Sequence, residues 1–212
     1  MTIKLYCFGE SGNAYKAALT LELSGLAWEP VFVDFFHGET RTPEFRALNP
    51  MGEVPVMVDG DVTLSQSGVI QDYVTSKSGK LGGRSAAERR EVLRWVFWDN
   101  HKLSSQAGTV RFLMNFLPED KRPDAAVIAF LQARLRSAYK VLDAELGTRD
   151  WLVDDVFTIA DIACCGYLYY PEPFGFDRAD WPNIDAWLDR IAEQPGWKHP
   201  YDLMPGRPSD RA

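Results

Sequence analysis

Two short stretches of this sequence have the residue types and spacing needed to bind a small peptide. Gln66-Ser67 opens a predicted helix, and hydroxyl and amide groups at a helix start favour a bound carboxylate. Pro55 cannot donate to a strand ladder, so it should lie on a sheet edge or begin its strand and leave the backbone of Val54 open to an extended peptide. These residues predict a binding site for short acidic peptides. An ordinary hairpin packed on a helix is the alternative, but it explains neither the proline nor the polar helix start.

A polar turn, Gly9-Glu10-Ser11-Gly12-Asn13, joins a predicted strand at 3–8 to a helix that ends at Gly25. Serine and asparagine are preferred N-cap residues, so helix capping is the simplest role for Ser11 and for Asn13. The order of elements resembles the thioredoxin-like fold, in which a reactive cysteine pair stands at the start of this helix. Ser11-Gly12-Asn13-Ala14 takes that place here, which suggests that the ligand brings the thiol.

The elements that position these stretches divide the chain into two predicted domains. A strand, a helix and a second strand at 28–33 are followed by a hairpin, at 54–58 and 62–64, and by the helix that Ser67 opens. We therefore expect an α/β thioredoxin-like domain at 1–79, a linker at 80–85 and an all-α helical domain at 86–212.

Several predicted elements are less regular. We expect a loop with one helical turn at 35–47, and a long helix at 86–116 that is kinked near Gly108. Apolar residues at steps of three and four predict a buried helix face at 128–146, and a last helix is expected at 183–193. The sequence from 194 onward has no clear period.

Two motifs resemble those of the glutathione S-transferase family. NPMGEVPVMVDGDVTLSQS, at 49–67, is similar to the family form NPxGxVPxLxDGxxxLxES, although Glu53 and Gln66 depart from its usual residues. TIADI, at 158–162, resembles the capping motif of the family's second domain, with Thr158 and Asp161 as a capping box. SGNxYK, from Ser11, is similar to a bacterial subgroup with a hydroxyl residue and an asparagine at this spacing.

The resemblance implies a function as well as a fold. Glutathione would be the co-substrate, bound through Val54, Gln66 and Ser67, with a cis peptide bond before Pro55. Ser11, assisted by Asn13, would hold the thiolate for attack on a small electrophile cradled by the helical domain. Whether Asn13 contacts the sulfur or caps the helix stays open. The family is usually homodimeric, so a homodimer is implied.

The energy required for this chemistry is modest. A free thiol with a pKa near 8.5 is only about 3% thiolate at pH 7, and lowering that pKa by two units takes about 2.7 kcal/mol. A hydrogen bond to a charged group supplies about 1.5 to 3 kcal/mol, and a helix N-terminus about 0.3 to 1 kcal/mol. One hydroxyl and one helix end therefore suffice, and neither a metal nor an imidazole base is required.

Composition excludes other classes of function. The 212 residues carry a formal net charge of −7, which argues against the broad basic surface of a nucleic-acid or anionic-membrane binder. No apolar run approaches the roughly 20 residues of a membrane span. The three cysteines form no CxxC motif, so we expect no disulfide framework, no zinc site and a reduced cytoplasmic location.

Two alternatives to a glutathione transferase stay open. In one, the bound thiolate attacks disulfides or peroxides instead of a carbon electrophile. In the other, a transferase-like protein has lost catalysis and serves as a binding or scaffold module. Glu53 and Gln66, which depart from the family motif, are the residues that favour this alternative.

Overall fold

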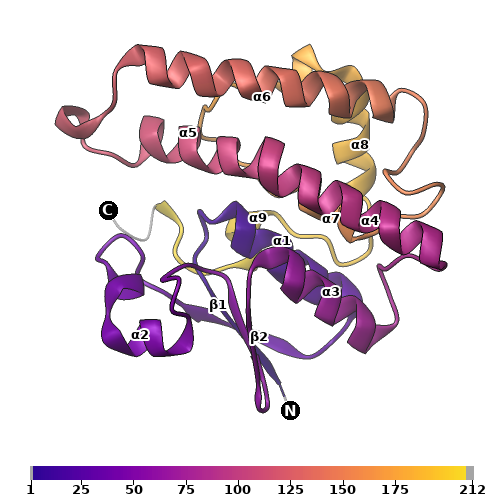
Figure 1. Ribbon diagram of the computed structural model, residues 1–212, viewed down its shortest axis with the longest axis horizontal. Coiled ribbons are helices and arrows are strands. Elements are labelled where there is room, and N and C mark those ends of the chain that lie inside the picture. The colour runs from indigo at the N-terminus through magenta and orange to yellow at the C-terminus, as the bar shows by residue number, and fades with distance from the viewer. Residues whose placement is uncertain (1, 209–212) are drawn as a thin grey trace. The chain divides into compact units, whose positions relative to one another are not determined.

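The computed structural model describes residues 2–208, which form two compact units (Figure 1). The first unit contains the described residues up to Gly82 together with those from Gln194 onward, and the second runs Gly83–Glu193. The expectation that the helical domain extends to the end of the chain was therefore wrong for the segment after Gln194. That segment contains α9 (Pro200–Leu203), which packs against the first helix of the same unit, at 12–24.

The first unit is built on a four-stranded sheet with the strand order β2-β1-β3-β4. β1 is parallel to β2 and antiparallel to β3, and β3 and β4 form a hairpin. This topology confirms the predicted β-α-β and β-β-α units and the thioredoxin-like class. The bounds are β1 (Ile3–Cys7), α1 (Gly12–Ser24), β2 (Trp28–Phe32), β3 (Val56–Asp59), β4 (Val62–Ser65) and α3 (Ser67–Ser78).

Local sequence signals explain where these elements begin and end. β1 buries alternate residues, as expected for a strand with one face in the core. α1 begins after the N-cap Ser11 and ends at Gly25, whose φ of +77° is the left-handed conformation that glycine adopts without strain. α1 and α3 pack against each other.

The segment after β2 is more helical than predicted. A short 3-10 turn, η1 (Glu39–Arg41), leads into α2 (Pro43–Leu48), where a loop with one irregular turn was expected. Thr42 caps α2 by accepting from the N–H of Phe45 at 3.2 Å, and Pro43 occupies its first turn, where a missing N–H costs nothing.

The second unit is helical, as predicted, but its first long helix is interrupted at another place. α4 (Ala86–Trp98) and α5 (Ser105–Asn115) are joined by a π-helical stretch, η2 (Asp99–Ser104), whose end residues are linked by a hydrogen bond of 2.7 Å. The kink expected at Gly108 is wrong. A Cβ at Gly108 would lie 2.8 Å from the hydroxyl oxygen of Tyr167, so glycine is needed there for close packing.

The remaining helices of this unit are α6 (Ala125–Leu146), α7 (Ile159–Cys165) and α8 (Pro182–Ala192). The predicted capping box is present at the start of α7: the Thr158 N–H donates to the Asp161 carboxylate at 3.0 Å. Asp154, in the turn before α7, adopts a left-handed φ of +49°.

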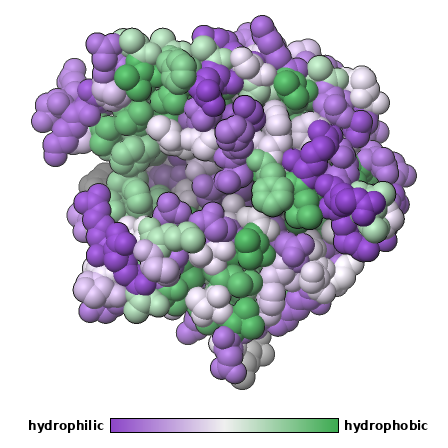
Figure 2. Space-filling view, in the orientation of Figure 1, coloured by the Kyte–Doolittle hydropathy of each residue, from purple (hydrophilic) through white to green (hydrophobic). Residues whose placement is uncertain are grey.

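The surface in Figure 2 is mainly hydrophilic, with apolar groups between the polar ones. Several of the largest exposed apolar side chains belong to α4 and α6, and they are Leu93, Phe97, Val127, Phe130 and Val141. Within residues 2–208, every helix is too short or too polar to cross a bilayer.

Candidate functional site

The sheet brings the three predicted segments, the Ser11 turn, Val54-Pro55 and Gln66-Ser67, to one edge. Tyr6 of β1 is opposite Val56 of β3, so the end of β1 lies beside the start of β3. Val56 is also opposite Ser65 of β4, so the start of β3 lies beside the end of β4. The polar turn with Ser11 follows β1, Val54-Pro55 precedes β3, and Gln66-Ser67 follows β4.

Ser11 caps α1 and has a hydrogen atom left to donate. Its Oγ accepts from the N–H of Ala14 at 3.1 Å, and its backbone N–H donates to the carbonyl of Phe8 at 3.1 Å. A hydroxyl has one donor and two acceptor lone pairs, so the cap occupies one lone pair and leaves the O–H available. Ser11 is only 9% exposed, and capping fixes the position of its oxygen. Capping and donation to a ligand are therefore compatible.

Asn13 does not cap the helix. It is the second residue of α1, and the cap is made by Ser11. Its Oδ1 is buried and has no hydrogen-bond partner among the described residues. The structure thus removes the capping alternative for Asn13, and its contact with a ligand sulfur stays a prediction.

The Val54-Pro55 peptide bond is cis, as the family resemblance implies. Pro55 is buried and directly precedes β3, which lies inside the sheet, so its missing N–H removes no ladder hydrogen bond. Pro55 was predicted to lie on an edge strand or to begin its strand, whereas β3 begins one residue later, at Val56, and is not an edge strand. Val54 is half-buried and lies outside the paired residues of β3.

The start of α3 has an unusual backbone. Gln66, the N-cap residue, has a φ of +70° and a ψ of 117°, and its side chain makes no capping hydrogen bond. Instead its Nε2 lies 3.2 Å from the sulfur of Met51 and 3.5 Å from a carboxylate oxygen of Glu53. A strained backbone at a non-glycine residue is typical of ligand sites. The two residues that depart from the family motif, Glu53 and Gln66, are thus neighbours.

Cys7 is not a candidate nucleophile. It lies in β1 with no exposed surface, and burial raises the pKa of its thiol to about 12. Cys164 and Cys165 are buried in α7. None of the three cysteines therefore presents an exposed thiol.

Three phenylalanines near the site were missed by the sequence reasoning. Phe8 stacks on Phe35 with ring centroids 4.8 Å apart, and Phe36 meets both rings edge-on, at 5.8 and 5.3 Å. Phe8 follows β1 and Phe35 follows β2, and parallel strands end at the same edge of a sheet. Two adjacent aromatic residues directly after the second strand were the available signal, but 35–47 was interpreted as a polar loop.

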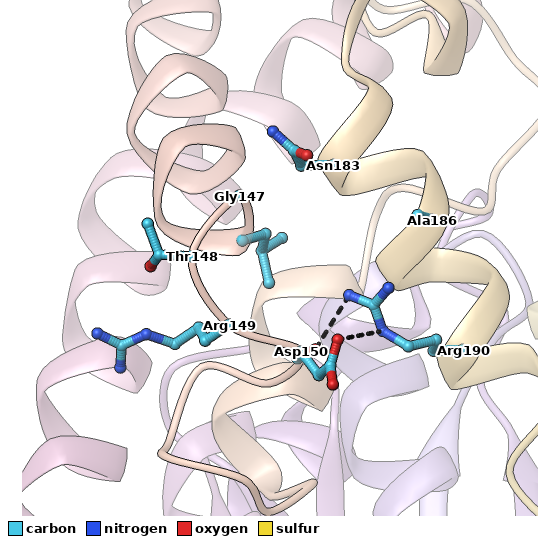
Figure 3. A pocket seen from close by; sticks show the side chains of 8 residues that line it. Gly147, Thr148, Arg149, Asp150, Asn183, Ala186 and Arg190 are labelled. Atoms are coloured by element: carbon cyan, nitrogen blue, oxygen red, sulfur yellow. Dashed lines mark hydrogen bonds and ion pairs between the residues drawn. The ribbon is translucent and has the colours of Figure 1, made fainter.

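A separate hollow lies in the helical unit, between the end of α6 and α8, with a volume of about 310 Å³ (Figure 3). In Figure 3 Arg190 and Asp150 are directed toward each other, whereas Arg149 extends away from them. Arg190 donates to the carbonyl of Asp150 at 3.1 Å and lies 4.0 Å from its carboxylate, while Arg149 pairs with Glu145. These charges are thus paired with one another, and we assign the hollow no chemistry.

Comparison with known proteins agrees with the geometry. Family models described as the N-terminal and C-terminal domains of glutathione S-transferase match residues 1–76 and 105–195. Glutathione S-transferase F10 of Arabidopsis thaliana is 31% identical, with 88% of this chain and 90% of that protein covered. The disulfide-bond oxidoreductase YfcG of Escherichia coli strain K12 is 30% identical, with 91% of each covered.

Solved structures are also similar. A glutathione transferase from Burkholderia graminis, crystallised with two glutathione molecules bound per subunit, superimposes with a TM-score of 0.82. That chain is 27% identical, and the match covers 92% of this chain and 85% of the other.

Proposed function

The chain belongs to the glutathione S-transferase family, and on this premise we propose that it binds glutathione in its first unit and activates the thiol for attack on a small electrophile. The observation that carries the proposal is the hydroxyl of Ser11. It caps α1 through a lone pair and keeps its hydrogen for a sulfur placed at the helix N-terminus.

The bound peptide would use all three parts of the site. The backbone of Val54, just outside the β3 ladder, pairs with the extended cysteinyl part of glutathione. The N-terminus of α3, at Gln66 and Ser67, binds a carboxylate, because it has no side-chain cap among the described residues and its dipole favours negative charge. The sulfur then lies toward the Ser11 turn at the same edge.

In the reaction, the sulfur lone pair of the thiolate forms a bond to an electrophilic carbon, and the leaving group departs with its bonding electrons. The thiol proton has already passed to solvent. Ser11 donates its hydrogen bond to the thiolate, and Asn13, two residues later, would donate a second from its amide. The cluster of Phe8, Phe35 and Phe36 provides apolar surface at this edge for an apolar electrophile.

Two measurements test this function. Retention on immobilised glutathione, checked by calorimetric titration, tests binding. Turnover of glutathione with a chlorinated aromatic compound then tests transfer. Binding with turnover supports the proposal, whereas absence of binding contradicts it and binding without any turnover supports the scaffold alternative.

Disulfide reduction is the second candidate, because a relative of similar identity is named a disulfide-bond oxidoreductase. The thiolate of one glutathione would attack the disulfide and release one thiol, and a second glutathione would resolve the mixed disulfide, giving oxidised glutathione and the second thiol. Cys7 cannot supply these electrons, because its thiol is buried and protonated. Faster turnover of a small disulfide than of the chlorinated aromatic would favour this candidate.

We also expect a homodimer in the cytoplasm. The five exposed apolar side chains on α4 and α6 offer surface for a second copy, and the three cysteines are free and buried, which suits a reducing compartment. Light scattering on the purified protein tests the dimer, and a monomer at micromolar concentration would contradict it.

A further inference from the structure

The segment from Gln194 to Gly206, which we call the return segment, follows α1 toward its N-terminus. Lys198 forms an ion pair with Glu22 at 2.6 Å, and its carbonyl accepts from the hydroxyl of Tyr15 at 2.9 Å. Farther along, the carbonyl of Pro205 accepts from the N–H of Gly9 at 2.6 Å. These contacts move from residue 22 to 15 to 9, so the return segment ends at the turn that carries Ser11.

Two glycines allow this close approach. A Cβ at Gly9 would lie 3.2 Å from the carbonyl oxygen of Gly206, 3.2 Å from the Tyr201 ring and 3.3 Å from the carbonyl oxygen of Pro205. Gly206 has a φ of +85°, and a Cβ there would lie 2.4 Å from the ring of Phe32. A side chain at Gly9 would therefore push the return segment and the turn apart.

The turn is short and tightly held, so its contacts with the return segment are transmitted to Ser11. Gly9 and Glu10 are buried, and the Ser11 N–H donates to the carbonyl of Phe8 across them. Gly9 is also bonded from outside by Pro205. Only the buried Glu10 separates Gly9 from Ser11, so a displacement of Gly9 by a few tenths of an ångström acts on the residue next but one.

We propose that the return segment is a positioning device for the reaction: the Pro205 carbonyl holds Gly9 and thereby sets the Ser11 hydroxyl in line with the glutathione sulfur. This inference rests on the proposed function of Ser11. A hydrogen bond weakens steeply as its angle and length depart from the optimum, so a small shift of Ser11 raises the pKa of the bound thiol. Peptide binding at Val54, Gln66 and Ser67 is untouched by such a shift.

Gly9→Ala tests the proposal in the full-length protein. The pKa of bound glutathione, measured from the ultraviolet absorbance of the thiolate against pH, should rise by about 0.5 to 1 unit, which is a loss of thiolate of about 3- to 10-fold at low pH. Measured at the same low pH, kcat should fall by up to a similar factor, while KM for glutathione stays within about twofold. Gly82→Ala is the matched control, because its Cβ would meet Thr75 at an ordinary 3.4 Å.

A second pair of variants keeps the test decisive if Gly9→Ala folds poorly. A chain that ends at Met204 lacks the Pro205 carbonyl and should show the same rise in the bound thiol pKa. Pro205→Ala, in the full-length chain, keeps the backbone carbonyl at this position, so its bound thiol pKa should stay near that of the wild type.

The proposal is overturned if the perturbed proteins that fold keep the bound thiol pKa within about 0.3 units and kcat within about twofold of the wild type, whatever their thermal stability. Failure of the proposed function would be visible separately. In that case the wild type would not bind glutathione, or Ser11→Ala would leave the pKa of the bound thiol unchanged.

Discussion

Replacing Ser11 by alanine separates the two roles of its hydroxyl. The change removes the acceptor of the 3.1 Å hydrogen bond from Ala14 and the proposed donor to the thiolate. Loss of a hydrogen bond to a charged group costs about 1.5 to 3 kcal/mol, which corresponds to a rise of about 1 to 2 units in the pKa of bound glutathione. Loss of the cap should lower the free energy of unfolding by about 1 kcal/mol.

Starting from a bound thiol pKa near 6.5, about two units below the free value, a rise to 7.5–8.5 lowers the thiolate fraction at pH 7 from about 75% to between 25% and 3%. A thiolate of higher pKa is intrinsically more nucleophilic, which offsets part of the loss. We therefore expect kcat at pH 7 to fall about 3- to 20-fold, and the difference from the wild type to shrink above pH 9.

Ser85→Ala is the matched control, because Ser85 caps α4 by accepting from the N–H of Glu88, also at 3.1 Å. It should reduce stability by a comparable amount without changing the pKa of bound glutathione, and Ser11→Thr should recover most of the activity. The reasoning is refuted if Ser11→Ala still binds glutathione and the bound thiol titrates within about 0.3 units of the wild-type value.

Two further predictions concern the carboxylates of Asp161 and Glu53. Burial raises the pKa of Asp161 to about 6, against the opposing hydrogen bonds from the Leu152 N–H and the Trp187 indole. Because this pKa lies above the unfolded value of 3.8, the group stabilises the fold below about pH 4, and about 3 kcal/mol is lost as the pH rises through 6. Urea unfolding of Asp161→Asn should lack this loss between pH 4 and 7, and an unchanged pH profile would contradict it. Glu53→Gln removes a negative charge beside Gln66, where the anionic peptide is proposed to bind. Two unit charges about 4 Å apart in water repel by about 1 kcal/mol, and less at longer range, so calorimetry should show glutathione binding up to about fivefold tighter. Equal or weaker binding would contradict this.

The parts of the fold that the sequence predicted are those with local signals. The predicted strand at 3–8 corresponds to β1, the helix ends at Gly25 as predicted, and the predicted hairpin corresponds to β3 and β4. The capping box at Thr158 was visible because its two side chains are only three residues apart. The site residues themselves were found from a family motif, and the shared sheet edge gives that grouping a physical reason.

The features that were not predicted depend on contacts between distant residues. Gly108 suggested a kink because glycine weakens a helix, but its role is to admit the Tyr167 hydroxyl. The break at 99–104 has no glycine or proline to announce it. The Phe8 and Phe35 rings meet only because their strands are parallel neighbours, and the return segment has no periodic pattern to show which unit it joins.

The first unit, which contains the candidate site, is formed from two separate segments of the chain that are translated at different times. Its first part is complete at Gly82, and its last part begins at Gln194, so about 110 residues of the helical unit are translated between them. At roughly 5 to 20 residues per second, a ribosome needs about 6 to 22 s for that interval. The nascent sheet and α1 then exist without the backbone carbonyl that holds Gly9. Full catalytic competence would thus be acquired only after the helical unit has been made.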